Sequence, residues 1–352
     1  MRLGLNLGYW GAGNDANNLV VAQEADRLGY SSVWAAEAYG SDVATVLTWV
    51  AAHTEHVDVG SAIFQIPGRS PAMAAMTAAT LDTLSGGRFR LGLGVSGPQV
   101  SEGWHGVRFD KPLARTREYV DIVRLALSRE RVVYDGKHYT LPLPDGPGKA
   151  LKLIVHPVRA TIPIYLAAVG PKNVELAGEI ADGWLAIFFA PDRSEEQRKQ
   201  LAAGRAKAGK DLTGFDIVPT VPVVIGDDVE ACADAVRPHC ALYVGGMGSR
   251  QQNFYNDLAV RLGFADAAAE IQDKYLSRDY EGAAAAVPTE FVDATALIGP
   301  TERITKRLQA YADAGVTTLS VAGYSGSLDD RLATVRAMGQ ALSDAGLAEE
   351  VA

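Results

Sequence analysis

One local order of residues recurs along the chain and constrains its fold more than any other feature. A helical stretch is followed by a glycine or an Asp-Gly pair and then by a short apolar run, as in residues 25–36 (ADRLGYSSVWAA), 177–187 (AGEIADGWLAI) and 312–322 (ADAGVTTLSVA). Glycine favours the backbone conformation that ends a helix, and the apolar run after it predicts a buried strand. Because parallel strands need a crossover between them, usually a helix, this order predicts parallel βα units.

Eight apolar runs predict strands of this kind: residues 3–7, 32–36, 57–63, 89–94, 164–168, 183–187, 217–224 and 317–322. Helical patterns follow them, and Leu113, Val120 and Val123, for example, share one helix face. Eight strands, each followed by a helix, most simply close into a (β/α)8 TIM barrel, which is an α/β fold. We therefore predict a single barrel domain over residues 1–352.

Two stretches depart from the repeat. Residues 131–160 contain VVYDGKHYTL, in which Asp135-Gly136 between β-rich flanks predicts a hairpin. Residues 246–298 hold further helical material before the last βα unit. We interpret both as insertions into strand-to-helix loops, the end of a barrel where sites are built. The second insertion is interpreted as a lid or a dimer contact, with a purely structural layer as the alternative.

Charge and composition exclude several classes of function. A net charge of −9 and a pI near 5.2 disfavour a nucleic-acid partner, because such partners are bound through clustered Lys and Arg. The two cysteines, Cys232 and Cys240, are too few for a disulfide framework and are not spaced as a CxxC pair. With no signal-peptide pattern and no apolar segment of about 18 residues, we expect a soluble cytoplasmic protein without a membrane partner.

The segment GGRFRLGLGVSG, residues 86–97, ends in the spacing Gly92-x-Gly94-x-x-Gly97, which is typical of a dinucleotide-binding turn. A Rossmann turn needs a helix that starts at its third glycine, and the sequence after Gly97 predicts no helix before about Lys111. This strand is also the fourth along the chain rather than the first. We therefore predict that the glycines instead let a flat ligand ring approach the backbone.

A phosphate site is predicted where strand 164–168 runs into Gly170-Pro171-Lys172, because a helix that starts there leaves backbone N–H groups free for an anion. An ordinary tight turn is the alternative. The histidines show no metal-ligand spacing, and no GxSxG motif points to a covalent nucleophile. The predicted strand ends are mostly apolar and carry few acids. We therefore predict no metal and a planar organic cofactor that supplies the reactivity itself.

The segments VWAAEAYGSD, VGSAIFQIPGRSPAMAAMTAATLDTLSGGRFRLGLGVSG, SEGWHG and PIYLAAVGPKNVELAGEIADGW follow one another along nearly the whole chain. Together they resemble the luciferase-like monooxygenase family, and more closely its branch of oxidoreductases that use the deazaflavin coenzyme F420. The resemblance implies a cofactor ring at the C-terminal ends of the strands and a non-prolyl cis peptide bond between Ala62 and Ile63. It also implies cofactor contacts from Gly94, Val95, Ser96, Gly97, Glu102, Ala167, Ala168, Val169, Gly170 and Pro171.

The chain departs from the pattern of this family at two places. Relatives that act on sugars or alcohols carry Asp-His after the second strand, where this chain has Glu37-Ala38. Some relatives bind phosphate through hydroxyl side chains that correspond here to Ile-Phe-Phe at 187–189, so phosphate binding there is left to the backbone or to Arg250. The predicted cofactor contacts therefore include Phe188 and Arg250. Glu37 is the candidate for proton handling or for a hydrogen bond to the cofactor, with a capping role as the alternative.

The resemblance implies reversible hydride transfer between C5 of coenzyme F420 and a small organic substrate that the sequence does not identify. Tyr9, Trp10, Tyr39 and Trp104 are candidates for apolar walls of the site, with core packing as the alternative. Two rival hypotheses are an FMN-dependent monooxygenase on the same barrel and a non-catalytic flavin- or deazaflavin-binding protein. The resemblance also implies a homodimer.

Overall fold

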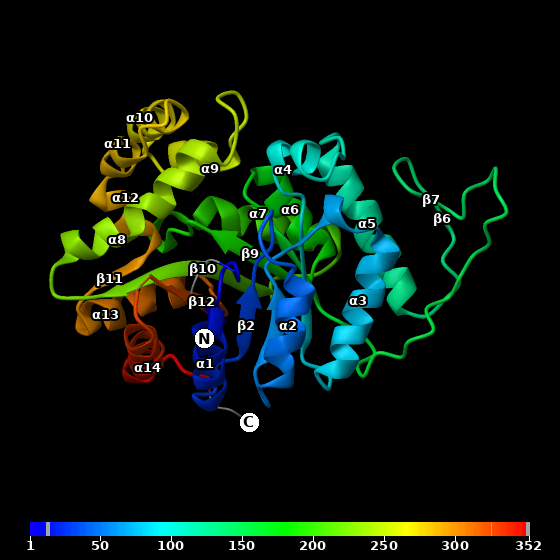
Figure 1. Cartoon of the computed structure of the whole chain (residues 1–352), viewed down its shortest axis with the longest axis horizontal. Coiled ribbons are helices and arrows are strands. Elements are labelled where there is room, and N and C mark those ends of the chain that lie inside the picture. The colour runs from blue at the N-terminus through cyan, green and yellow to red at the C-terminus, as the bar shows by residue number, and fades with distance from the viewer. Residues whose placement is uncertain (12–14, 325, 350–352) are drawn as a thin grey trace.

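A computed structural model of the chain describes residues 1–11, 15–324 and 326–349. Its barrel strands are β1 (Arg2–Asn6), β2 (Ser32–Ala35), β3 (Asp58–Ser61), β5 (Phe89–Gly94), β8 (Ile164–Ala167), β9 (Gly183–Ile187), β10 (Asp216–Ile225) and β12 (Thr318–Gly323). Neighbouring strands in this order are parallel, and the pairing of β12 with β1 closes the ring (Figure 1). The eight predicted strands and the TIM barrel are therefore confirmed.

Helices cover the outside of the barrel. They are α1 (Asp15–Arg27), α2 (Val43–Ala52), α3 (Pro71–Leu84), α5 (Pro112–Leu127), α6 (Pro171–Ile180), α7 (Glu195–Lys207), α13 (Thr301–Asp313) and α14 (Leu328–Asp344). Three of them start where the sequence supplies a capping side chain, because Asp42 accepts from the N–H of Thr45, Ser70 from that of Met73 and Ser327 from that of Asp330. None of the described helices is long and apolar enough to cross a membrane.

The inside of the barrel is filled by large side chains. Trp34 and Tyr165 are almost fully buried and meet edge to face, with ring centroids 5.2 Å apart, and Leu185 and Val218 complete this cluster. Aromatic pairs of this geometry add stability beyond the apolar area that they bury. Tyr165 is the second residue of β8, close to where the strands begin. We call this aromatic layer, which lies beneath the C-terminal rim, the floor of the barrel.

Charged side chains close the opposite end of the barrel. Arg90 donates to Asp58 at 2.7 Å, to Asp216 at 3.0 Å and to the hydroxyl of Tyr165 at 3.0 Å. Arg2 adds a second cation beside Asp216, at 3.1 Å. These side chains come from the first residues of β1, β3, β5, β8 and β10, so they pin the strand starts to one another. Any opening for a ligand therefore lies at the other end.

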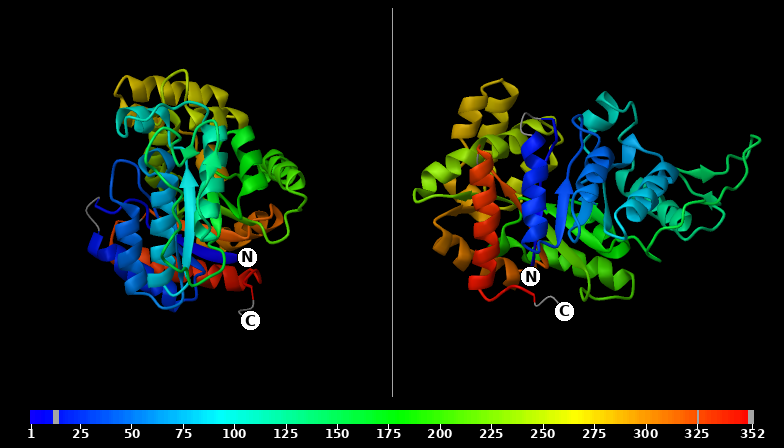
Figure 2. Two further views of the ribbon diagram at one scale, coloured as in Figure 1. Left: turned by 90° about the vertical axis from the view of Figure 1, so that its right-hand side faces the viewer. Right: turned by 60° about the horizontal axis from the view of Figure 1, so that its bottom comes forward.

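The second insertion is longer than predicted, because it starts directly after β10. It comprises α8 (Val229–Ala241), a π-helical turn η3 (Leu242–Gly246), α9 (Phe254–Arg261), α10 (Ala265–Leu276), α11 (Tyr280–Ala285), α12 (Thr289–Thr295) and β11 (Leu297–Gly299). The amphipathic α8 looks like a barrel helix in the sequence, yet its apolar face packs into a second core with α9–α12. The barrel helix at this position is α13. Figures 1 and 2 show the inserted helices at the end of the barrel opposite the chain termini.

The first insertion was placed wrongly by the sequence analysis. Its hairpin exists, with β6 (Tyr134–Asp135) paired to β7 (Thr140–Leu141), and it projects away from the barrel in both figures. However, α5 precedes it and β8 follows it, so it lies in a helix-to-strand connection and not in a strand-to-helix loop. The barrel helix that follows the fourth strand is α5, and it ends at Leu127, before this insertion begins. This insertion therefore belongs to the end of the barrel remote from the rim.

The loop after β5 also differs from the prediction. A short helix, α4 (Pro98–Gly103), starts directly after Gly97, where no helix was expected before Lys111. Proline at the first helical position favours the helical backbone here. The sequence pattern did not predict this helix because Gly103 and Gly106 are more typical of a loop. A further short strand, β4 (Phe64–Gln65), follows β3 and pairs with β5. Both additions lie at the C-terminal rim.

Candidate active site

The ends of β3, β5 and β8 lie close together at the rim. The peptide bond between Ala62 and Ile63 is cis, as the resemblance implies. Ala62, Ile63 and Ala167 lie on the aromatic floor of the barrel and keep part of their surface open. Four of the predicted site residues, these three and Gly94, are therefore brought together.

Two glycines of the GxGxxG spacing are explained by this packing. A Cβ atom on Gly92 would lie 1.9 Å from the carbonyl oxygen of Ser61, and one on Gly94 would lie 2.2 Å from the side chain of Ile63. The clash at Gly92 is with backbone, so β5 approaches the end of β3 only because Gly92 carries hydrogen there, whereas the atom near Gly94 is the end of the Ile63 side chain. On Gly97 the nearest atom would be the flexible end of Gln99, at 3.2 Å. Close strand packing therefore accounts for the first two glycines without a dinucleotide.

A line of polar side chains crosses the rim beside this corner. The amide of Gln65, which is buried, donates to the hydroxyl of Ser96 at 2.5 Å, and its carbonyl oxygen lies 2.9 Å from Nε2 of His105. Ser96 is held with φ at 57°, in the left-handed region. Ser96 was predicted from the resemblance, whereas Gln65 and His105 were missed. They come from separate loops, and nothing in the sequence pairs them.

Glu37 is tied into the rim rather than free. Its carboxylate accepts from the N–H groups of Gln65 at 2.9 Å and Val43 at 3.3 Å, and it forms an ion pair with Arg69. The side chain of Glu37 is only 8% exposed. Arg69 also reaches Asp42 at 2.6 Å. These contacts join the loop after β2 to β4 and to the start of α3, and proton handling by Glu37 stays a prediction.

The turn between β8 and α6 presents backbone donors. Within the described part of the chain, no group accepts a hydrogen bond from the N–H of Val169, Gly170 or Lys172. Helix α6 has Gly170 as its N-cap, without a side-chain cap. Arg261, at the end of α9, donates to the carbonyl oxygen of Val169 at 3.1 Å, and burial lowers its pKa. A cation and several free N–H groups therefore meet at the predicted phosphate turn.

Other predicted residues lie apart from this corner. Arg250 pairs with Asp273 on α10, and both side chains are more than half exposed. Glu102 accepts from the N–H of Phe109 at 3.1 Å and so closes its own loop. Phe188 is 2% exposed and lies in the second core beneath the insertion. Participation of these three side chains in cofactor binding stays a prediction that their contacts do not favour.

The inserted helices reach across the mouth of the barrel. A Cβ atom on Gly97 would lie 4.0 Å from the carbonyl oxygen of Met247, in the loop after η3. The rings of Phe109 and Phe254 lie 6.1 Å apart and connect the loop before α5 to α9. With the contact of Arg261 on Val169, the insertion touches the loops after both β5 and β8. The insertion therefore packs against the rim loops, and its role as a lid, a dimer contact or a structural layer stays a prediction.

Residues 9–318 match the family of luciferase-like monooxygenases. The chain belongs to this family. A Mycobacterium tuberculosis protein whose name assigns it provisionally to the coenzyme F420-dependent oxidoreductases is 46% identical over 343 residues, which are 95% of this chain and 99% of that protein. A 5,10-methylenetetrahydromethanopterin reductase of Archaeoglobus fulgidus is 30% identical over 305 residues, 85% of this chain and 86% of that one.

A solved structure shows the same fold in a luciferase-like relative. The coenzyme F420-dependent tetrahydromethanopterin reductase of Methanopyrus kandleri superposes with a TM-score of 0.80 at 23% identity, and the match covers 96% of this chain and 97% of that one. The match to the family model over residues 9–318, and not this likeness of fold, shows the family. The family resemblance is therefore confirmed.

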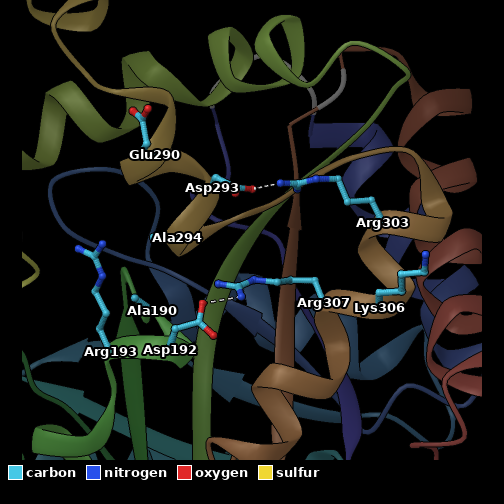
Figure 3. A pocket seen from close by; sticks show the side chains of 9 residues that line it. All are labelled: Ala190, Asp192, Arg193, Glu290, Asp293, Ala294, Arg303, Lys306 and Arg307. Atoms are coloured by element: carbon cyan, nitrogen blue, oxygen red, sulfur yellow. Dashed lines mark ion pairs between the residues drawn. The ribbon is translucent and has the colours of Figure 1, made fainter.

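A second pocket of this luciferase-like chain lies on the flank of the barrel, where η2 (Pro191–Arg193) meets α12 and α13. It has a volume of about 470 Å³ and is lined by Ala190, Asp192, Arg193, Glu290, Asp293, Ala294, Arg303, Lys306 and Arg307. Two ion pairs lie in it, Arg303 with Asp293 at 2.7 Å and Arg307 with Asp192 at 2.5 Å (Figure 3). It contains no residue predicted to bind the cofactor.

Proposed function

We propose that this protein transfers hydride between coenzyme F420 and a small organic substrate. The relative at 46% identity, matched along almost its whole length, is the observation that carries the proposal, because its name specifies this coenzyme. The rim geometry supports it independently. The partly open surfaces of Ala62, Ile63 and Ala167 are proposed to contact the ring, and the donors of the turn before α6 to bind its anionic tail.

The residues of this chain have distinct tasks in the proposed reaction. Bound coenzyme supplies the hydride chemistry itself. The N–H groups of Val169, Gly170 and Lys172, with Arg261 beside them, hold a phosphate by charge-assisted hydrogen bonds. The insertion excludes water from the mouth, which strengthens polar interactions beneath it. Glu37 acts mainly by position, because its ion pair with Arg69 fixes the strand β4 that carries Gln65.

Binding of the two candidate cofactors tests the proposal. Purified protein is titrated with coenzyme F420 and separately with FMN, and the fluorescence of each is followed. Quenching of the deazaflavin at low concentration, without comparable FMN binding, is the expected result. The reverse order of affinities would favour the FMN-dependent monooxygenase. Tight F420 binding with no oxidation of its reduced form by ketones, aldehydes, enones or nitroaromatics would favour a non-catalytic binding protein.

The proposed enzyme acts as a homodimer. Large apolar side chains remain exposed on neighbouring helices, namely Trp49 on α2 at 53% and Met73 and Met76 on α3 at 50% each. Such clusters on a surface are typical of protein contacts. Light scattering of the purified protein gives the mass that decides this point.

A further inference from the structure

A further group of aromatic side chains lies where the loops after β1 and β12 meet the insertion, and three of its members pack against Phe188 of the second core. We call it the aromatic cluster: Tyr9 after β1, His239 on α8, Tyr243 in η3, Tyr255 on α9 and Tyr324 after β12. The His239 ring lies 4.7 Å from that of Tyr243 and 5.3 Å from that of Tyr324. The Tyr243 ring lies 4.9 Å from that of Tyr255. The cluster therefore combines two barrel loops with three inserted elements.

The aromatic cluster has the properties of a recess wall. Each of its five side chains keeps part of its surface accessible to solvent, and Tyr9 is 39% exposed. Burial nevertheless raises the pKa of Tyr9 and Tyr243, raises that of Tyr255 to about 12, and lowers that of His239 to about 4. These side chains are therefore largely surrounded by protein and keep accessible edges that a ligand can contact.

The five side chains of the cluster are uncharged near pH 7. Burial, rather than a charged neighbour, is the main cause that raises the pKa of its tyrosines. Neither ring nitrogen of His239 has a hydrogen-bond partner among the described residues. An imidazole that is partly accessible and has no protein partner can pair with a polar atom of a ligand.

The position of the cluster is fixed by a local irregularity of the insertion. Helix α8 runs into a π-helical turn, and such wide turns occur frequently at functional sites. The side-chain amide of Asn253 donates to the carbonyl oxygens of Tyr243 at 3.1 Å and Val244 at 3.0 Å. A Cβ atom on Gly246 would lie 2.2 Å from the ring of Tyr275, so this turn packs tightly on α10. Tyr243 is therefore held rigidly toward the rim.

We propose that the aromatic cluster binds the substrate, and that it selects uncharged molecules with a planar apolar body and a carbonyl or hydroxyl oxygen that hydrogen-bonds to His239. This inference rests on the proposed function only for the identification of the ligand as a substrate. Because the imidazole is neutral near pH 7, it can donate to a carbonyl or accept from a hydroxyl. The same wall rejects carboxylates and phosphates, since it offers no cation.

Binding to the protein without coenzyme tests the proposal. The probes are acetophenone and 4-acetylbenzoate, which share a ring and a ketone and differ by one carboxylate. Their dissociation constants and the imidazole NMR signals are measured for the native protein and for His239→Phe, His239→Gln and the exposed control His53→Gln. His239→Phe keeps the ring shape without nitrogen atoms, and His239→Gln keeps a hydrogen-bond donor. The unfolding midpoint of each variant confirms that it is folded.

Acetophenone is expected to bind at least about tenfold more tightly than 4-acetylbenzoate and to shift the signal of His239. His239→Phe should weaken acetophenone binding about fivefold, whereas His239→Gln and His53→Gln should change it less than about twofold. Equal binding of the two probes, no acetophenone binding, or full affinity in His239→Phe would overturn the proposal. Coenzyme F420 is titrated into the same variants. If it fails to bind while acetophenone binds as expected, only the proposed function fails.

Discussion

Gly92 shows how one hydrogen atom can decide the meaning of a motif. Alanine at this position would place a methyl group 1.9 Å from a backbone oxygen of β3. Gly92→Ala is therefore expected to destabilise the protein by about 3 kcal/mol or more, because the clash is with backbone. Gly97→Ala meets only a flexible side chain, so its effect should stay within about 0.5 kcal/mol. Urea unfolding of both variants measures this difference, and equal losses would contradict the packing explanation.

Glu37 illustrates the difference between a positioning and a proton-transferring carboxylate. Glu37→Gln leaves the largely buried Arg69 with only its exposed partner Asp42, and we expect a loss of about 3 kcal/mol of unfolding free energy. The matched control Asp42→Asn removes that exposed partner and should lose less than about 1 kcal/mol. If Glu37→Gln keeps full stability but flattens the pH dependence of turnover, proton handling is the better description.

His239 should make a measurable contribution to the pH dependence of stability. Burial lowers its pKa from the usual 6.5 to about 4, so an unfolded chain takes up a proton at a higher pH than the folded one. The stabilising contribution of neutral His239 is complete above about pH 6.5, falls as the pH drops toward 4, and is then constant. Urea unfolding between these pH values should show that the unfolding free energy of His239→Gln declines less steeply with falling pH than that of the native protein. Parallel declines would show that His239 is solvated like a free imidazole.

At the scale of elements, the contact between α9 and the turn before α6 sets the predicted phosphate site. Arg261 lies on the carbonyl oxygen of Val169, whereas Arg250, the arginine expected from the sequence, pairs with Asp273. Arg261→Met should therefore weaken coenzyme F420 binding by about tenfold or more, the value of one charge-assisted hydrogen bond. Arg250→Met is the matched control and should leave the affinity within about twofold.

Binding of a phosphate-free deazaflavin that keeps the ribityl chain separates the contribution of the phosphate from that of the ring in the same experiment. Its affinity should be unchanged in Arg261→Met, since the lost interaction is with the phosphate. If Arg250→Met weakens coenzyme binding more than Arg261→Met, the original expectation for Arg250 is correct and the placement of the tail on α6 is wrong.

At the scale of the whole molecule, the barrel is held shut at one end by Arg90. This side chain is buried and neutralises carboxylates from two other strands, Asp58 and Asp216. Arg90→Met should leave both carboxylates without their buried cation and lower the unfolding free energy by about 3–5 kcal/mol. Arg2 also pairs with Asp216 but is 36% exposed, so Arg2→Met should lose less than about 1 kcal/mol. Thermal unfolding of both variants measures the contrast, and a small loss for Arg90→Met would show that water replaces it.

The repeated order of helix, glycine and apolar strand was enough to predict the barrel. The spacing of apolar residues, which is local in the sequence, indicates which helix face and which strands are buried. Periodicity does not separate α8 from the barrel helices, although α8 packs with α11 and α12 in the second core as well as on β10. It also missed α4, since glycines interrupt the pattern around six helical residues. Such errors concern which neighbour covers a face, and periodicity carries no information about that.

The resemblance located the corner at Ala62 and Ile63 and the turn before α6 from the sequence alone, because both are continuous segments whose backbone forms the site. Only the tertiary structure brought His105 to Gln65, Arg261 to Val169 and His239 to Tyr324. The residues of each pair are distant along the chain, and the last two pairs form only because the insertion folds against the barrel loops. A side chain that acts across such a contact has no local signature, so its role could be read only from the packed molecule.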